Sequence, residues 1–286
     1  MKIYTKIVRK FFQAYKKAFC IVWIKKHSQK GNIHMPAKSA AIKKIPFSRE
    51  KVWIRPTMSD VSRVGEFMNE IYFEDCYLHS ALKAKKPNKL IDVGANIGLS
   101  SLSLMKEFQL KTIIAIEAES ENFGVLKKNF ELWSQEFPET NWIAIHGCAT
   151  NELGAEIFTL DSLSTLNRNY SASGTFRYSN NPKELDKSTE KVTGIKPITL
   201  NEIFLNIPDN EKVICKIDIE GGEEILFKSN TEWVNKCIFI TSEIHDRFHP
   251  SMINSSRNMI DCLTRSNFAA VPNEDIIHFY NRDLIQ

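Results

Sequence analysis

The first sharp motif of the chain places an acid and two glycines directly after a short apolar run. Its informative residues are Asp92, Gly94, Asn96 and Gly98. Gly94 allows the backbone to approach a ligand closely, and Gly98 allows a following helix to pack near the strand. The spacing differs from the dinucleotide fingerprint, and an acid beside the turn disfavours a pyrophosphate. The motif instead favours a cationic ligand, and S-adenosylmethionine, with its ammonium and sulfonium groups, is one.

A second acid ends the next predicted strand. Glu117 follows Gly94 by about 20 residues, the separation at which an acid accepts hydrogen bonds from ribose hydroxyls in a Rossmann arrangement. Either motif alone is weak, because acids often follow strands in solvent. Together, and in this order, they predict a crevice that binds a nucleoside.

A lysine and an aspartate interrupt the apolar run at residues 213–219. Lys216 and Asp218 share one face of this predicted strand, because side chains alternate along it. Charged groups in an apolar strand are costly unless they are paired or bind a ligand. Gly221 and Gly222 then permit a tight turn at the carboxyl end, where open α/β sheets bind ligands. A structural ion pair is the alternative, but this position favours a functional role.

An acid and a histidine end another predicted strand. Glu243 and His245 alternate onto one face, and they converge with Asp218 if the two strands are neighbours. Such a set can deprotonate a hydroxyl, with His245 as the natural base near neutral pH. The three residues could also bind a divalent metal. Neither a helical histidine pair nor a cysteine pair supports a metal, so we expect none.

Short apolar runs alternate with helical stretches from Lys89 onward, which indicates βαβ units and a parallel sheet. The expected strands span residues 90–93, 112–116, 142–146, 213–219, 238–244, 268–271 and 276–280. The expected helices span residues 97–108, 120–133, 200–205, 223–233 and 252–266. A short antiparallel strand is expected at residues 156–160, followed by a long polar loop to residue 191 that is functional or disordered.

Taken together, the motifs resemble the FkbM-type methyltransferases, which depend on S-adenosylmethionine. The matching segments are Asp92–Gly98 with Ser100, Glu117–Ala118, Asn122–Phe123 through Asn129, Lys216–Glu223 and Glu243–Asp246. The resemblance covers roughly residues 53–250, with the core motifs within 90–250. It implies the Rossmann-like class I fold, a mostly parallel seven-stranded sheet with helices on both faces. It also implies O-methylation of a hydroxyl on a sugar, a glycan or a small natural product.

The resemblance assigns roles by position. Asp92, Gly94, Asn96 and Gly98 would line the methionine end of the cofactor, and Glu117 would hold the ribose. The adenine would be bordered by Ala118, Asn122, Phe123 and the pair Cys148–Ala149. Asp218 would lie nearest the transferred methyl group, and the catalytic set would be Asp218, Glu243 and His245. One departure is that Ala118 and Glu119 stand where the family more often has a proline after the acid.

The long loop is expected to shape the pocket for the methyl acceptor. Four of its residues could bind an anionic or sugar acceptor: Arg168, Tyr170, Arg177 and Tyr178. A non-catalytic protein that keeps the cofactor fold and docks on a membrane is an alternative from a different class. A nicotinamide oxidoreductase is disfavoured by the glycine spacing.

The net charge of +4 hides a strongly basic N-terminal arm. The first 60 residues hold 15 Lys and Arg but only two acids, Glu50 and Asp60. We expect a basic helical extension with a linker at residues 1–51 and a methyltransferase domain at 52–286. Residues 3–23 have amphipathic spacing that suits a membrane surface or a packing partner. Residues 1–50 could thus contact an anionic membrane, while a solvated tail is an equal alternative. Nucleic acid is an unlikely partner, because the rest of the chain is acidic.

The sequence points to a reducing compartment. The six cysteines have neither metal-ligand nor redox spacing, and no secretory signal is convincing. The apolar stretch from Ala18 to Ile24 is well short of the ~20 residues that span a bilayer. We therefore expect a cytoplasmic protein, with a peripheral position at the inner membrane face as an open alternative.

Overall fold

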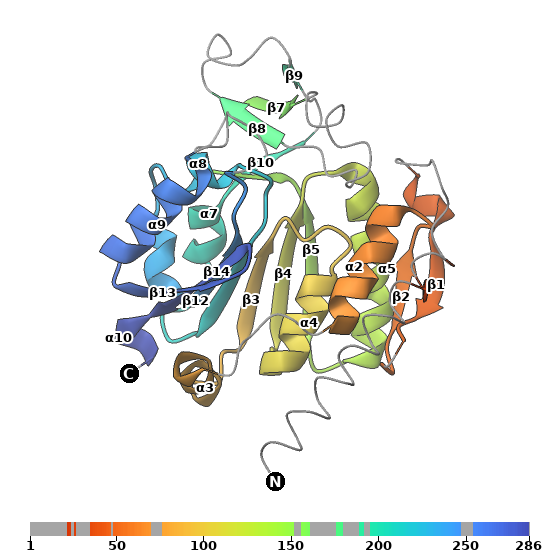
Figure 1. Cartoon of the computed structure of the whole chain (residues 1–286), viewed down its shortest axis with the longest axis horizontal. Helices are drawn as coiled ribbons and strands as arrows, with labels where there is room; N and C mark the ends of the chain where they lie inside the picture. The colour runs from red at the N-terminus through yellow and green to blue at the C-terminus, as the bar shows by residue number, and fades with distance from the viewer. Residues whose placement is uncertain are drawn as a thin grey trace. The chain divides into compact units, whose positions relative to one another are not determined.

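Five parallel strands and an antiparallel pair form the central sheet of the protein (Figure 1). The computed structural model describes residues 22–23, 26, 35–46, 48–69, 76–151, 156–160, 176–179, 189–191, 195–246 and 254–285. The chain forms two units, one of residues 1–73 with 168–172 and the other of residues 74–167 with 173–286.

The first unit contains a hairpin and a helix. Strand β1 (Ala41–Lys44) pairs in antiparallel fashion with β2 (Lys51–Ile54), and α2 (Met58–Asn69) follows; the short helix η1 (Ala37–Ser39) precedes the hairpin. The linker predicted within residues 1–51 is therefore wrong over β1, because the residues of β1 pair with those of β2. The predicted helix at residues 3–23 lies outside the described residues except at positions 22 and 23. The division of the chain at residue 51 stays a prediction.

A buried ion pair fixes the start of α2. The Arg55 guanidinium and backbone N–H both donate to the Asp60 carboxylate, at 2.6–2.9 Å. Both side chains are almost fully excluded from solvent. The pair satisfies two buried charges with several hydrogen bonds, as a buried ion pair requires.

The second unit is built on the seven-stranded sheet. Its strand order is β13-β14-β12-β11-β3-β4-β5, with β14 antiparallel to both of its neighbours. The strands are β3 (Lys89–Val93), β4 (Thr112–Glu117), β5 (Asn141–His146), β11 (Val213–Ile217), β12 (Cys237–Glu243), β13 (Phe268–Asn273) and β14 (Ile276–Asn281). This confirms the predicted α/β class and the mostly parallel seven-stranded sheet.

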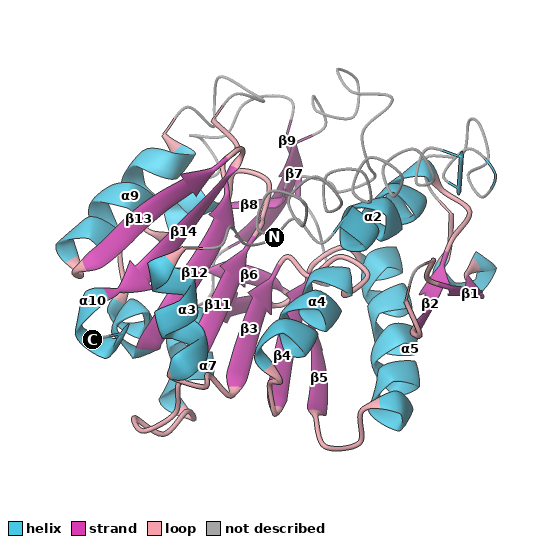
Figure 2. Ribbon diagram, turned by 60° about the horizontal axis from the view of Figure 1, so that its bottom comes forward, coloured by secondary structure: helices cyan, strands magenta, loops and turns pink. Residues whose placement is uncertain are grey.

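Helices lie on both faces of this sheet (Figure 2). The helices are α3 (Tyr77–Ala84), α4 (Leu99–Phe108), α5 (Ser120–Glu136), α7 (Leu200–Leu205), α8 (Glu223–Leu226), η3 (Glu232–Lys236), α9 (Ser255–Arg265) and α10 (Arg282–Ile285). The strand order runs in opposite directions on the two sides of the β3/β11 pair. Right-handed crossovers therefore place α4 and α5 on one face and α8 and α9 on the other.

One sequence prediction on this unit is wrong. The helix expected at residues 223–233 ends already at Leu226, and the 3-10 helix η3 follows after a turn. Asn230 in that turn has a left-handed backbone with φ of 55°, which interrupts a right-handed helix. Trp233, on η3, is 2% exposed and belongs to the core on that face of the sheet.

Two smaller sheets complete the described part of this unit. Strand β6 (Cys148–Thr150) pairs in parallel with β10 (Pro197–Thr199). Strand β7 (Glu156–Leu160) lies between β8 (Phe176–Ser179) and β9 (Thr189–Lys191), antiparallel to both. The antiparallel strand predicted at residues 156–160 is confirmed as β7. The long loop predicted to reach residue 191 contains the strands β8 and β9. In the ranges that the structure describes, no helix is both long and apolar enough to cross a membrane.

Candidate active site

The functional residues predicted from sequence gather at the carboxyl ends of the central strands. The order of the sheet reverses between β3 and β11, and open α/β sheets bind ligands at such a point. Asp92 lies near the end of β3, Glu117 ends β4, and Asp218 directly follows β11. The Asp218 N–H donates to the Val93 carbonyl at 2.9 Å, which holds the ends of β3 and β11 together.

Asp92 is held inside the protein beneath the first glycine motif. Its side chain is fully buried, and its Oδ2 accepts hydrogen bonds from the hydroxyls of Ser100 (2.8 Å) and Ser101 (2.6 Å). Its Oδ1 lies 3.4 Å from the Lys216 ammonium. The carboxylate thus anchors the start of α4 and is balanced by a lysine.

The two glycines of the motif are needed for close packing. Gly94 has φ of +78°, and a Cβ there would lie 1.8 Å from the Asp218 carbonyl oxygen. Gly98 has φ of +90°, and a Cβ there would lie 2.7 Å from Leu126 Cδ1 on α5. The close packing predicted at Gly98 is therefore present, although its neighbour is a helix. At Gly94 the close neighbour is the end of β11, and approach of a ligand stays a prediction.

Glu117 closes the loop that contains Asn96. Its Oε2 accepts from the Asn96 N–H at 2.7 Å, and its Oε1 accepts from the Glu119 N–H at 2.9 Å. Burial raises the pKa of the Glu117 carboxyl to about 7, although both backbone hydrogen bonds lower it. Asn96 has a left-handed backbone (φ 52°), and its buried Oδ1 lacks a hydrogen-bond partner within the described part of the chain. An acceptor in this position is suited to a ligand that donates hydrogen bonds.

The residues predicted to border an adenine lie around the start of α5 and in β6. Asn122 is 3% exposed at the first turn of α5, and Ala149 is 6% exposed in β6. The Phe123 ring stacks on the His146 ring with centroids 4.7 Å apart and planes 13° apart. His146 Nε2 also donates to the Ala118 carbonyl at 3.2 Å. Sequence reasoning assigned no role to His146, although its position at the end of a strand was a usable signal.

The departure from the family pattern at Glu119 has a local explanation. Glu119 precedes α5, and its carboxylate accepts from the backbone N–H groups of Glu121 and Asn122 at 3.0 and 2.6 Å. It therefore caps the N-terminus of α5, where a negative charge is also favourable. Farther along α5, Asn129 donates to the Ile97 carbonyl at 2.8 Å and ties the helix to the first glycine motif.

Lys216 joins three parts of the site. Its Nζ donates to the Gly94 carbonyl at 2.8 Å and lies 3.4 Å from Asp92 Oδ1 and 3.3 Å from Asp218 Oδ2. The side chain is 13% exposed. The structural ion pair that the sequence left open is thus present, and it is connected to the predicted cofactor loop.

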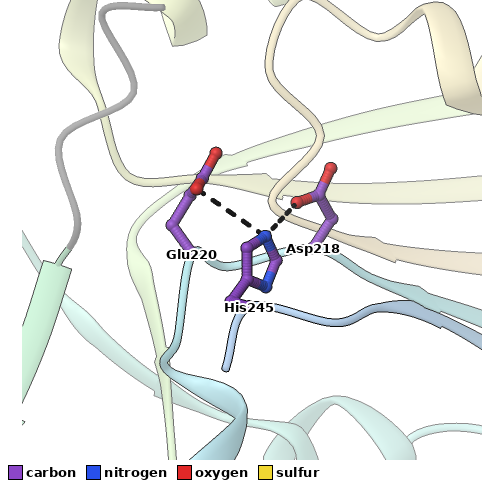
Figure 3. Close-up of side chains that lie close together, drawn as sticks. All are labelled: Asp218, Glu220 and His245. Carbon is purple, nitrogen blue, oxygen red and sulfur yellow. Dashed lines mark ion pairs between the residues drawn. The ribbon is translucent and has the colours of Figure 1, made fainter. Parts of the chain in front are cut away.

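Asp218 and His245 converge, as the sequence predicted, and Glu220 joins them (Figure 3). His245 Nε2 lies 3.5 Å from Asp218 Oδ1 and 3.6 Å from Glu220 Oε2. One ligand atom from each of these residues lies within 4.8 Å of the other two. The predicted third member, Glu243, ends β12 two residues before His245 and is not in this group.

The imidazole of His245 is fixed from its other side by Glu223. Glu223 is 1% exposed, accepts from the N–H groups of Ile219 (3.0 Å) and Gly221 (2.8 Å), and places Oε1 3.1 Å from His245 Nδ1. Burial lowers the pKa of His245, but the carboxylates of Glu223 and Asp218 outweigh it and raise that pKa to about 11. The proposed role of His245 as a base stays a prediction.

Comparison with known families shows which family the chain belongs to. The model of the Methyltransferase FkbM domain matches residues 92–269, which contain every site residue described above. The chain belongs to the FkbM methyltransferase family. The methyl donor of this family is S-adenosylmethionine, and the class I fold is the one predicted. No curated protein matches the chain.

Solved structures with a similar fold include other methyltransferases at low sequence identity. The methyltransferase FkbM of Methylobacillus flagellatus is 14% identical with a TM-score of 0.45, over 68% of this chain and 44% of that one. This FkbM methyltransferase thus spans less than half the length of that protein. An O-methyltransferase of Bacillus cereus, solved with S-adenosylhomocysteine, is 11% identical with a TM-score of 0.37, over 77% and 90% of the two chains.

Proposed function

We propose that this FkbM methyltransferase transfers the methyl group of S-adenosylmethionine to a hydroxyl oxygen of a sugar, a glycan or a small natural product. The observation that carries the proposal is the position of Asp218. Its carboxylate is 16% exposed, directly beside the Gly94 loop, with Lys216 on one oxygen and His245 on the other. An acid held at the carboxyl end of β11 can reach both a bound donor and an acceptor hydroxyl.

The residues on the β3 and β4 side are chemically suited to the donor. The Glu117 carboxylate would accept hydrogen bonds from the ribose hydroxyls, because it is an acceptor that the fold already holds in place. The Asn96 amide oxygen, buried and unbonded within the described residues, would accept from the donor's ammonium group. Asp92 would act indirectly, because it anchors the start of α4, directly after the Gly94–Gly98 loop. Gly94 and Gly98 would shape that loop.

An adenine would lie against the start of α5. The bordering residues would be Ala118, Asn122, Phe123 and Ala149, as the resemblance implied. The stack of Phe123 on His146 adds an aromatic surface at the same rim. A flat base packs well against such a ring.

The chemistry of the acceptor depends on residues of β11 and β12. S-adenosylmethionine supplies an electrophilic methyl group when bound. A sugar hydroxyl is a weak nucleophile, so a group beside it must accept its proton. Asp218 is better placed for this than His245, which is 1% exposed, and Glu243 stays a further candidate. Alignment of the hydroxyl with the methyl group would supply much of the rate acceleration.

The acceptor pocket itself stays a prediction. Arg168 and Tyr170 lie outside the described residues, and Arg177 and Tyr178 lie in β8, where the structure describes the backbone alone. The test of the proposed function is methyl transfer from radiolabelled S-adenosylmethionine to separate pools of sugars, glycans, small phenols, RNA and protein. Labelled methyl ethers of a sugar or small hydroxyl compound are expected. Label confined to nitrogen, to RNA or to protein would overturn the hydroxyl assignment.

The basic arm is proposed to bring the enzyme to the cytoplasmic face of an anionic membrane through residues 1–50, ahead of a methyltransferase domain at 52–286. The support is the charge of that segment against an acidic remainder. Deletion of residues 1–34 keeps the β1–β2 hairpin intact, so it is the cleaner truncation. Full-length protein is expected to co-sediment with anionic vesicles and the truncated protein is not. Equal binding of both would refute the arm's role.

A further inference from the structure

Three side chains from the ends of two neighbouring strands present ligand atoms to one point. Asp218 and Glu220 follow β11, and His245 follows β12, with which β11 pairs in parallel. We propose that Asp218, Glu220 and His245 bind a divalent cation at the carboxyl ends of β11 and β12. Figure 3 shows the three side chains directed toward one another.

The distances within the cluster fit a ligand shell. His245 Nε2 lies 3.5 Å from Asp218 Oδ1 and 3.6 Å from Glu220 Oε2. Charge-assisted N–H···O hydrogen bonds are shorter, about 2.7–2.9 Å. Two ligands bound at about 2.1 Å in tetrahedral geometry lie about 3.4 Å apart. The observed separations therefore match two ligands of one cation better than a direct hydrogen bond.

A residue outside the cluster gives independent support. Glu223 faces the other ring nitrogen of His245, with Oε1 3.1 Å from Nδ1, and is itself 1% exposed. A histidine that binds a metal almost always donates its second N–H to such a carboxylate, which fixes the ring and its tautomer. Here Glu223 lies at ion-pair distance from Nδ1, without the geometry of a hydrogen bond, while Nε2 faces the other two carboxylates. Backbone N–H groups of Ile219 and Gly221 hold Glu223 in turn.

Two of the three side chains in the cluster are partly exposed to solvent. Asp218 and Glu220 are 16% and 29% exposed, while His245 lies beneath them at 1%. Lys216 faces Oδ2 of Asp218, at 3.3 Å, whereas Oδ1 faces His245. The Lys216 ammonium thus balances the charge on Oδ2 of Asp218, while Oδ1 is directed toward His245. A cation can enter from solvent and keep positions for water or an acceptor oxygen.

The ligand set also indicates which cation would bind. Carboxylates suit Mg²⁺, Ca²⁺ and Mn²⁺, whereas imidazole suits Zn²⁺ and other transition metals. One imidazole and two carboxylates therefore favour Mn²⁺ or Zn²⁺ over Mg²⁺. This differs from the sequence-based expectation of no metal, which rested on the lack of a helical histidine pair and of a cysteine pair.

The inference extends to the acceptor, and that extension rests on the proposed function. A cation at this point would bind an oxygen of the acceptor and hold it beside the methyl donor. Acceptors with two neighbouring oxygen atoms, such as vicinal diols of a sugar, could occupy two open positions. The substrate class expected is therefore a vicinal diol.

The test is a titration of full-length protein with Mn²⁺. The electron paramagnetic resonance signal of free Mn²⁺ measures how much of the metal is bound. One Mn²⁺ per chain is expected, displaced by Zn²⁺ more readily than by Mg²⁺. Glu220→Gln should weaken binding at least 10-fold, and Glu223→Gln by roughly 10- to 100-fold through the histidine. Glu139→Gln is the matched control, because Glu139 is exposed in the turn before β5. It should bind Mn²⁺ like the natural protein.

Two results would overturn the inference. One is the lack of stoichiometric Mn²⁺ binding by folded protein, and the other is equal affinity in Glu220→Gln and Glu139→Gln. Glu220 is 29% exposed, so its substitution decides the matter even if Glu223→Gln does not fold. Binding needs neither donor nor acceptor, which separates this test from the proposed function. Methyl transfer that persists in chelator would refute the role of the cation in holding the acceptor and leave O-methylation standing.

Discussion

Lys216 donates a hydrogen bond to the carbonyl oxygen of Gly94, at 2.8 Å, and so links the middle of the sheet to the loop predicted to hold the cofactor. The same ammonium lies between two carboxylates, those of Asp92 and Asp218. The Lys216 side chain therefore positions both the Gly94 loop and the Asp218 carboxylate. Lys216 thus sets the separation between Asp218 and the Gly94 loop.

Replacing Lys216 by methionine should destabilise the protein by about 3 kcal/mol, because Asp92 is left buried without its cation. Urea denaturation measures the change. Lys83→Met is the matched control, since Lys83 pairs with Glu107 while 47% exposed, and should cost at most about 1 kcal/mol. Similar losses in both variants would show that Lys216 has no special structural role.

Gly94→Ala should cost about 3 kcal/mol or more. The new Cβ would lie 1.8 Å from the Asp218 carbonyl oxygen, and φ of +78° is unfavourable for alanine. Gly222→Ala introduces the same methyl group where the backbone is right-handed, with the flexible end of Ile219 3.0 Å away, and should cost about 1 kcal/mol or less. Thermal denaturation compares them, and equal melting temperatures would contradict the close approach at Gly94.

Glu117 should make the free protein less stable as the pH rises. Its pKa is raised from 4.5 to about 7 in the fold, so the folded state holds this proton more tightly than the unfolded state does. The group therefore favours folding at low pH, and its contribution falls between pH 4.5 and 7, by roughly 3 kcal/mol in total. Glu117→Gln should remove this part of the pH dependence. Urea titrations at pH 5 and pH 8 test it, and an identical pH dependence in both proteins would refute the burial effect.

Asp218→Asn should reduce methyl transfer by roughly 100- to 10,000-fold, the range typical of a lost general base, with little change in donor affinity. Asp209→Asn makes the same chemical change at an acid that is 92% exposed and pairs with Lys236, and should keep full activity. Rates with saturating donor measure the effect. If Asp218→Asn retains full activity, another group accepts the proton.

The sequence was sufficient to place the predicted cofactor residues at one edge of the sheet, because parallel strands obey a geometric regularity. Asp92, Glu117 and Asp218 were predicted to meet since the carboxyl ends of parallel strands share one edge of a sheet. Side-chain alternation likewise predicts that Lys216 and Asp218 lie on one face of their strand. Strand positions were predicted to within a few residues for the same reason, because buried parallel strands are short and continuously apolar.

Alternation along the strands predicted the convergence of Asp218 and His245 but did not reach Glu220. Glu220 has φ of 53°, so its side chain leaves the strand pattern and reaches His245, where the sequence interpretation had placed Glu243. The role of Glu223 also required the structure, since it depends on the turn that brings two backbone N–H groups to its carboxylate. The stack of His146 on Phe123 joins residues of different elements, which periodicity along the chain does not reveal.

The central claim is that the crevice at the ends of β3, β4 and β11 binds S-adenosylmethionine. Calorimetric titration of the purified full-length protein with this donor tests it most directly. We expect one binding site per chain, lost in Glu117→Ala and unchanged in the exposed-site control Glu139→Ala. No binding to folded natural protein, or equal binding by both variants, would contradict the account.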